Sequence, residues 1–100
     1  MAVIAHVVLK GVSKEQYDAV RAECDWLEKT PDGGIAHLSW WEGDDNHNLD
    51  AWDSEEAFGH FGEDRLGPAM AKIGITAEPE TTFYPAHEVF LPAAVTLTVS

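Results

Sequence analysis

Cysteine and basic side chains are both scarce in this sequence. The chain has one cysteine, Cys24, so it cannot form an internal disulfide, and this suits a reducing compartment. It has 6 lysine and arginine residues against 18 aspartate and glutamate residues, which gives a formal net charge of −12. Because nucleic acids and anionic membranes are bound through clustered lysine and arginine, we expect neither as a partner.

Long apolar runs and metal-binding patterns are missing as well. The N-terminal apolar run, residues 2–9, has no basic segment before it and is too short for a secretion signal or a membrane span, so we expect a cytoplasmic protein. The sequence contains no H-x-H or H-E-x-x-H pattern and no cysteine pair. Residues 44–55 imitate a calcium loop, but Leu49 stands where that loop needs glycine. No metal site is predicted.

The composition is that of one globular domain. The chain has 100 residues, 45% of them hydrophobic and 10% aromatic, which is enough to form a core without disulfides or bound metals. We assign residues 1–92 to the domain and residues 93–100 to a tail. The helical spacing of Tyr17, Val20, Cys24 and Leu27 predicts that the cysteine is buried rather than reactive.

Local patterns predict four strands and two helices. Ser13 and Gln16 form a capping box at the start of the first helix. Ser54 caps the second helix, which Gly67-Pro68 either interrupts or restarts as a short segment. The predicted strands are residues 3–9, 35–42, 47–52 and 81–91, with a turn at 43–46, and the predicted helices are residues 14–29 and 55–73.

The element order βαββαβ predicts an α+β, ferredoxin-like fold. It has a four-stranded antiparallel sheet with both helices on one face. The first strand is apolar on both of its sides, so the face without helices needs a cover, most simply a second copy in a homodimer. The tail from Ala94 alternates apolar and hydroxyl residues, and it is either a frayed end or a fifth strand.

Three segments carry a resemblance to a known family. DAWDSEEAF, RLGPAM and FYPAHEVFLP resemble the dimeric α/β-barrel superfamily, in particular its antibiotic-biosynthesis-monooxygenase-like branch, over roughly residues 2–92. The resemblance implies a homodimer whose sheets form one barrel, with a cleft in each subunit between its sheet and its helices. Members include cofactor-free quinone-forming monooxygenases, haem-degrading enzymes, isomerases and proteins of no assigned activity.

The resemblance also implies site residues. The monooxygenases use an asparagine and a tryptophan four positions apart on the third strand, and Asn48 and Trp52 have this spacing. Their helix tyrosine is matched by Phe58, which lacks the hydroxyl. A basic position further along is matched by Arg65 or Lys72.

Haem is not expected as a cofactor. The haem-degrading relatives need a helix histidine as iron ligand, for which only His60 is available. By helical spacing His60 lies away from the face that Phe58, Phe61, Arg65 and Ala69 share. We therefore predict no cofactor, with the Phe58, Phe61 and Arg65 face bordering the substrate.

Four further polar residues are candidates for proton transfer. His6, His37 and His87 lie in three predicted strands, where each is either a base near neutral pH or a hydrogen-bonding group in the sheet or dimer interface. His87 leads as a catalytic candidate because it lies in the resembling segment PAHEVF. Asp50 shares a strand face with Asn48, and it is either a base with a raised pKa or an exposed strand acid.

The aromatic side chains exceed what a core of this size needs. Trp40 and Trp41 are adjacent, so they must point to opposite faces of their strand. Tyr84 is a further candidate for binding substrate. With small residues in the second helix, this surplus predicts room for a flat hydrophobic ligand. The small residues are Gly59, Gly62 and Gly67.

The sequence favours a cofactor-independent monooxygenase acting on a small aromatic or polyketide-like molecule. In that scheme a base (Asp50 or a strand histidine), the Asn48 amide and an aromatic wall that includes Trp52 act on a substrate whose own carbanion reacts with oxygen. Two alternatives remain: a non-catalytic dimeric binding module, and an isomerase or cyclase that needs only the base and the pocket.

Overall fold

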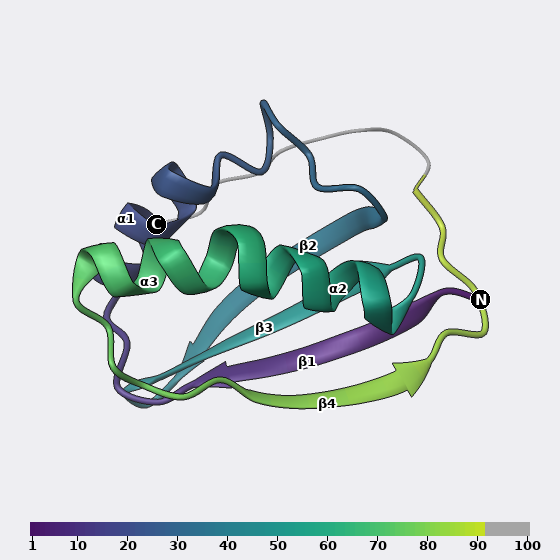
Figure 1. Cartoon of the computed structure of the whole chain (residues 1–100). Helices are drawn as coiled ribbons and strands as arrows, with labels where there is room; N and C mark the ends of the chain where they lie inside the picture. Colours follow the sequence, from purple (N-terminus) through teal and green to yellow (C-terminus); the bar gives the residue numbers. More distant parts are fainter. Residues whose placement is uncertain (92–100) are drawn as a thin grey trace.

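Residues 1–91 are described by a computed structural model, in which they form two layers (Figure 1). One layer is a four-stranded antiparallel sheet in the order β2-β3-β1-β4, and the helices cover one of its faces. The predicted α+β ferredoxin-like fold is confirmed. The elements are β1 (Val3–Leu9), α1 (Lys14–Cys24), β2 (Gly34–Glu42), β3 (Asp45–Trp52), α2 (Glu55–Phe61), the π-helical turn η1 (Gly62–Leu66), α3 (Gly67–Ile73) and β4 (Glu80–Pro85).

Helix α1 begins as predicted and ends early. The Ser13 hydroxyl accepts a hydrogen bond from the Gln16 backbone at 3.1 Å, which forms the predicted capping box. The helix stops at Cys24, well before the predicted end near Lys29, because Asp25 adopts a left-handed conformation with φ 51°. Aspartate tolerates this conformation better than most residues. The prediction of a longer helix was wrong, and an irregular segment leads to β2.

The second helix is continuous from α2 through η1 to α3. Gly67-Pro68 does not interrupt it, because η1 is one wide turn in which the backbone N–H of Gly67 donates to the Gly62 carbonyl, five residues back. A proline has no N–H and normally clashes with the preceding turn. Here Pro68 lies in the first turn of α3, where the missing donor is tolerated.

The β2–β3 hairpin is tighter than predicted. Its loop has two residues, Gly43 and Asp44, and Gly43 has the positive φ of 61° that such loops favour. β3 therefore begins at Asp45, and Asn46, which the sequence assigned to the turn, belongs to the strand.

The last strand is shorter than predicted. β4 ends at Pro85 instead of Leu91, so His87 lies beyond the sheet. Pro85 is in an edge strand, as expected for a residue without an N–H. The tail prediction for residues 93–100 lies outside the described residues.

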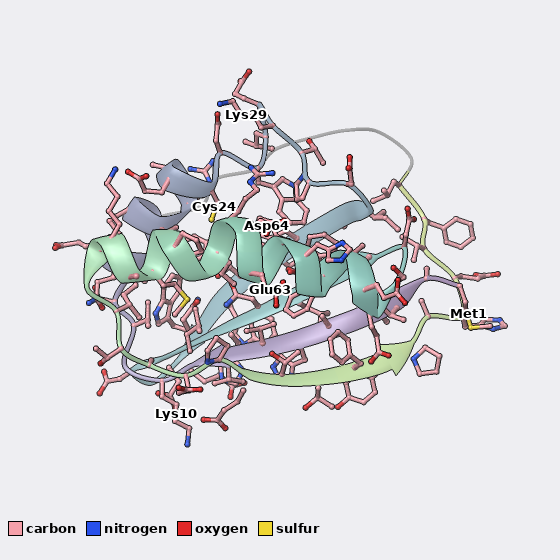
Figure 2. All side chains as sticks on the ribbon, in the orientation of Figure 1. Met1, Lys10, Cys24, Lys29, Glu63 and Asp64 are labelled. Atoms are coloured by element: carbon pink, nitrogen blue, oxygen red, sulfur yellow. The ribbon has the colours of Figure 1, made fainter. Side chains whose placement is uncertain are left out.

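The core lies between the sheet and the helices. Ala5, Val7 and Leu9 of β1 point toward the helices and pack with Phe61 and Met70. Side chains of both layers fill the space between them (Figure 2). Cys24 is buried, which confirms its predicted core position. No helix in the described part of the chain is long and apolar enough to cross a membrane.

The other face of the sheet has no helices over it (Figure 1). It displays apolar side chains, of which Leu38 is 58%, Tyr84 50% and Trp40 37% exposed. In its middle, His6 stacks on Trp40 and hydrogen-bonds His47 at 3.0 Å. Trp41 instead faces α1 and donates to the Val12 carbonyl, so the two adjacent tryptophans point to opposite faces as predicted. We call this uncovered surface the open face.

Candidate functional site

A row of polar side chains runs along β3 beneath the helices. Asn46, Asn48, Asp50 and Trp52 alternate along the strand, so all four point to the helix-covered face. Asn48 and Asp50 are each only 6% exposed. Polar groups buried this deeply need hydrogen-bond partners, which come from β1, from β2 and from β3 itself.

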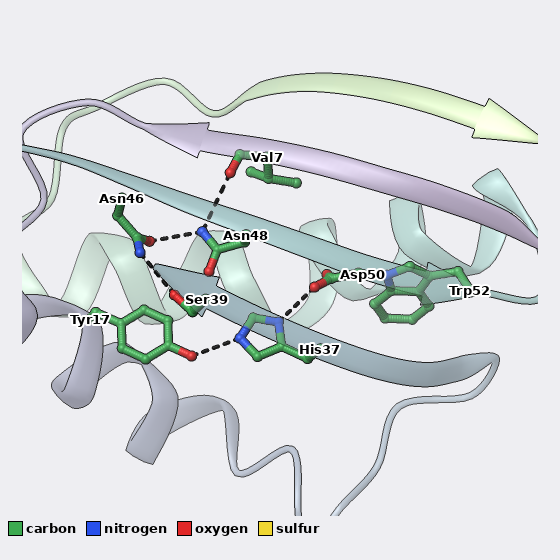
Figure 3. A network of polar contacts seen from close by, with 8 residues as sticks. All are labelled: Val7, Tyr17, His37, Ser39, Asn46, Asn48, Asp50 and Trp52. Carbon is green, nitrogen blue, oxygen red and sulfur yellow. Dashed lines mark hydrogen bonds and ion pairs between the residues drawn. The ribbon is translucent and has the colours of Figure 1, made fainter. Parts of the chain in front are cut away.

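Three residues from three elements form a hydrogen-bonded chain (Figure 3). The Tyr17 hydroxyl of α1 is 2.7 Å from Nε2 of His37 of β2, and Nδ1 of His37 is 2.6 Å from the Asp50 carboxylate of β3. The other Asp50 oxygen accepts from the Trp52 indole N–H at 3.2 Å. Both carboxylate oxygens are therefore occupied. His37 lies at the rim of the site, with its side chain 30% exposed.

These contacts indicate which nitrogen of the His37 ring carries the proton. An ionised carboxylate can only accept hydrogen bonds, so Nδ1 of His37 must donate to Asp50. In the neutral ring Nε2 then has a free lone pair, which accepts from the Tyr17 hydroxyl. Asp50 thus orients His37 and holds Nε2 ready to take a proton.

Asn48 carries an acceptor with no partner among residues 1–91. Its amide N–H₂ donates to Oδ1 of Asn46 at 2.8 Å, and Asn46 in turn donates to the Ser39 hydroxyl at 2.9 Å (Figure 3). The Asn48 oxygen is buried and unpaired. Reversing the amide would set that oxygen against the oxygens of Asn46 and Val7, so the orientation holds. An unpaired buried acceptor is costly unless a donor is brought to it.

Aromatic side chains close the space over Trp52, which is 0% exposed. Trp26, from the segment between α1 and β2, lies edge-to-face on Trp52 with ring centroids 5.2 Å apart. Phe58 and Phe61 of α2 pack at 5.6 and 5.4 Å. Trp26 also contacts the His37 ring at 5.7 Å, so it covers both residues.

Tyr17 is held in place by its neighbours. Its ring lies edge-to-face on Trp41 with centroids 5.6 Å apart, and its plane is within 4° of parallel to that of the His37 ring. Burial raises the pKa of the Tyr17 hydroxyl above its ordinary value of 10.0, and the charge of Asp50 acts in the same direction as a smaller cause. The hydroxyl is therefore kept protonated near neutral pH.

The structure brings together part of the predicted site. Asn48, Asp50 and Trp52 lie in the polar row of β3, and His37 of β2 hydrogen-bonds Asp50. The predicted aromatic wall of Phe58 and Phe61 packs beside Trp52. Arg65, by contrast, is engaged elsewhere. It lies over the Phe61 ring at 5.5 Å and donates to the carbonyl of Cys24, which ties the second helix to the end of α1.

Three other candidates lie apart from the row. His6 and Tyr84 are on the open face, with the sheet between them and the helices. His87 is exposed beyond the end of β4. His60 is exposed on α2, as its helical position predicted.

The glycines of the second helix border a groove, in line with the idea that small residues leave room beside this helix. Gly59, Gly62 and Gly67 line a surface groove of about 490 Å³ together with Phe58 and Met70. The groove lies against the segment before β4 and does not include the polar row of β3.

Sequence reasoning missed Tyr17, Ser39 and Asn46. Tyr17 was placed in a core stripe, and Asn46 in the hairpin turn. The available signal was the run Asn46, Asn48, Asp50, in which every second residue is polar in a strand that the fold buries. Among residues 1–91 no group of three or more histidine, cysteine, aspartate or glutamate side chains is placed to hold a metal ion.

The fold defines a class: it is the ferredoxin-like architecture that is also found in solved structures named as antibiotic biosynthesis monooxygenases, so the predicted resemblance is confirmed at the level of fold. SnoaB, a cofactor-independent oxygenase from Streptomyces nogalater, is similar at TM-score 0.62 and 14% identity, over 92% of this chain and 97% of its own. The monooxygenase ActVA-Orf6 of Streptomyces coelicolor, solved with nanaomycin D, is similar at TM-score 0.60 and 21% identity, over 92% and 93%.

A protein of unknown function from Nitrosomonas europaea has the same fold, at TM-score 0.69 and 17% identity over 93% of this chain and 96% of its own. No family model and no curated protein matches the chain. At these identities the likeness establishes the fold alone.

Proposed function

We propose that this protein is a cofactor-independent monooxygenase for a small hydroxylated aromatic or polyketide-like molecule. The observation that carries the proposal is the oriented base at the rim of the helix-covered face. Asp50 holds Nδ1 of His37 at 2.6 Å, and the unpaired amide oxygen of Asn48 lies in the same row. One group can take a proton, and the other can accept a hydrogen bond from the same molecule.

The chemistry needs only the substrate and dioxygen. Loss of a proton from an acidic CH₂ group of the substrate to the His37 base gives a carbanion, which adds dioxygen and forms a C–O bond. The resulting peroxide anion takes up a proton, and loss of water across the C–O–O–H unit leaves a carbonyl. His37 is the base, Asp50 orients it, and Asn48 positions the substrate.

Two neighbours of the same fold support this reaction class. SnoaB is named a cofactor-independent oxygenase, and ActVA-Orf6 is named a monooxygenase and was solved with the ligand nanaomycin D. The asparagine and tryptophan that the sequence resemblance matched, Asn48 and Trp52, are both in the row. Trp52 donates a hydrogen bond to the Asp50 carboxylate, so it helps to hold the group that orients His37.

A second candidate function is a non-catalytic dimeric binding module. It is favoured by the filled space over Trp52, where Trp26, Phe58 and Phe61 leave the indole 0% exposed. A monooxygenase must admit its substrate beside His37, whose side chain is partly exposed at the rim of the site, and the binding module has no such need.

We propose a homodimer under both candidate functions. The open face displays Leu38, Trp40 and Tyr84, and a second copy is the simplest cover for it. A lone buried cysteine also fits the proposed cytoplasmic location.

Oxygen uptake tests the proposal. The purified protein is mixed with 1,8-dihydroxyanthrone and dissolved oxygen is followed with an electrode. We expect protein-dependent uptake that falls roughly 100-fold in His37→Asn. In Asn48→Ala it falls roughly 10-fold to 100-fold. His60→Asn, which replaces an exposed histidine on α2, is the matched control and keeps the wild-type rate.

The outcomes separate the candidates. No uptake by the wild-type protein, combined with tight binding of the anthrone, would support the binding module and refute the oxygenase. If oxygen uptake is unchanged in both His37→Asn and Asn48→Ala, the reaction takes place in another part of the molecule.

A further inference from the structure

The nitrogen that the proposed reaction needs already has a partner. Nε2 of His37 accepts the Tyr17 hydroxyl at 2.7 Å, so a substrate cannot reach this lone pair directly while Tyr17 is in place. Tyr17 must either leave or pass the proton on.

The packing of Tyr17 favours passing the proton on. Its ring is fixed edge-to-face on Trp41 at 5.6 Å, and Trp41 is itself anchored to the Val12 carbonyl at 2.8 Å. The phenol and imidazole planes are nearly parallel, at 4°, and the hydroxyl is 2.7 Å from Nε2, which is hydrogen-bonding distance. Moving Tyr17 away would break this contact and its aromatic packing together.

We propose that Tyr17 is the catalytic residue that meets the substrate and relays its proton to His37. This rests on the proposed function and extends it. Tyr17 receives a proton from a hydroxyl or activated C–H of the substrate and gives its own proton to Nε2 of His37. Asp50 is a positioning residue, since it acts only through His37.

The protons balance in this relay. The acidic bond of the substrate breaks and a new Tyr17 O–H bond forms, while the original Tyr17 O–H bond breaks and an N–H bond forms at Nε2. Tyr17 ends neutral, and His37 becomes an imidazolium that donates through Nδ1 to Asp50. No charge stays on the phenol. This agrees with the burial of Tyr17, which disfavours the phenolate and raises its pKa.

The relay also narrows the substrate class. Figure 3 shows the unpaired oxygen of Asn48 on the same side of the sheet as His37 and Tyr17. A ligand that gives a proton to Tyr17 and a hydrogen bond to Asn48 carries at least two donor groups. A polyhydroxylated aromatic, such as a dihydroxyanthrone or a hydroquinone, meets this requirement, and an unsubstituted aromatic hydrocarbon does not.

The first test does not depend on activity. In ¹⁵N-labelled protein the two ring nitrogens of His37 are assigned with the help of His37→Asn, and their shifts report which one is protonated. We expect Nδ1 protonated and Nε2 accepting in the wild-type protein. Tyr17→Phe should keep this tautomer and shift Nε2 toward the value of an unbonded nitrogen. Asp50→Asn should abolish the tautomer preference. A proton on Nε2 in the wild-type protein would overturn the relay.

The second test uses turnover of 1,8-dihydroxyanthrone. We expect Tyr17→Phe to lower kcat roughly 100-fold with little change in KM, because the acceptor of the proton is lost while the aromatic body remains. The double variant Tyr17→Phe with His37→Asn should be no slower than the slower single variant, since both act in one relay. Circular dichroism and the Tm show whether each variant is folded.

The results separate this inference from the proposed function. If Tyr17→Phe turns over at the wild-type rate or faster, Tyr17 is not a relay although the oxygenase stands. If the wild-type protein shows no turnover, the oxygenase fails and so does the catalytic role of Tyr17, while the ¹⁵N shifts still report on the hydrogen-bonded chain. Loss of turnover in Tyr17→Phe with an unchanged Nε2 shift would contradict the relay as well.

Discussion

Trp26 depends on a glycine for its position over Trp52. A Cβ atom added at Gly34 would meet the Trp26 ring at 3.0 and 3.1 Å and the Pro31 carbonyl at 3.2 Å. The Trp26 ring can therefore approach β2 this closely only because residue 34 has no side chain. This close approach lets one irregular segment cover the buried indole and the His37 ring.

We predict that Gly34→Ala destabilises the fold by about 1–3 kcal/mol, because either the Trp26 ring or the backbone at Pro31 must shift. The measurement is the free energy of unfolding in urea. Gly59→Ala is the matched control: nothing lies within 4 Å of its new Cβ, and it removes a glycine from a helix. The control should gain about 0.5–1 kcal/mol. Equal effects of the two substitutions would contradict the close packing of Trp26.

Buried Cys24 and partly buried Tyr17 give the free energy of unfolding a defined dependence on alkaline pH. Burial raises the pKa of the Cys24 thiol above 9.0 and that of the Tyr17 hydroxyl above 10.0, so the folded state keeps both protons to higher pH than the unfolded chain does. Their contribution is complete below the unfolded pKa values and is lost as pH rises through the folded ones.

We therefore predict that the free energy of unfolding falls as pH rises past the ordinary pKa values of 9.0 and 10.0, and that it falls less steeply in Tyr17→Phe than in the wild type. Urea titrations in the presence of a reductant measure the slopes. Steeper loss in Tyr17→Phe would show that the hydroxyl is not protected by burial.

At the residue scale, a single sequence predicts which side chains share one face of a strand better than it predicts which side chains of different elements touch. The spacing of Asn48 and Trp52 placed both on one strand face, and the structure agrees. The contact between Tyr17 and His37 joins a helix to a strand, and helical spacing alone placed Tyr17 in the core. Because the meeting of side chains from different elements depends on how those elements pack, local periodicity does not reveal it.

At the scale of elements, the wide turn η1 sets the phase of the second helix. Met70 lies nine residues after Phe61, and an unbroken α-helix at about 100° per residue would put the two on opposite sides. A π turn accommodates one extra residue, which brings the two to roughly 80° apart. Both are buried in the same core. In the sequence, Gly67-Pro68 predicted an irregularity here, but it did not predict a continuous helix with a wide turn.

Deleting Asp64, an exposed residue of η1, should convert the wide turn to an α-helical one and keep the phase of the core residues. The deletion alone places Pro68 inside an α-helix and should cost about 3 kcal/mol. Adding Pro68→Ala should recover most of that loss. Thermal unfolding measures both changes. If Pro68→Ala rescues nothing, the proline is not the reason for the wide turn.

At the scale of the molecule, the order of elements determined the fold, because caps, turns and strand composition all agreed with one topology. The boundaries near residues 24 and 85 were missed, since a left-handed aspartate and a strand end leave weak local signals. The open face was foreseen from β1, whose residues are apolar on both sides.

We predict that the open face is the interface of a homodimer. Leu38, Trp40 and Tyr84 expose large apolar surfaces there, around the stacked His6 and His47. Leu38→Lys should put a charge into the buried contact of two chains, at a cost of several kcal/mol of association energy.

Sedimentation velocity at low micromolar concentration measures the change. The wild type should sediment as two chains and Leu38→Lys as one, with unaltered circular dichroism. Leu27→Lys is the control, because Leu27 is exposed beyond α1, away from the sheet, and its variant should remain dimeric. A wild-type protein that sediments as a single chain would rule out the interface, and with it the two-fold barrel that the resemblance implies.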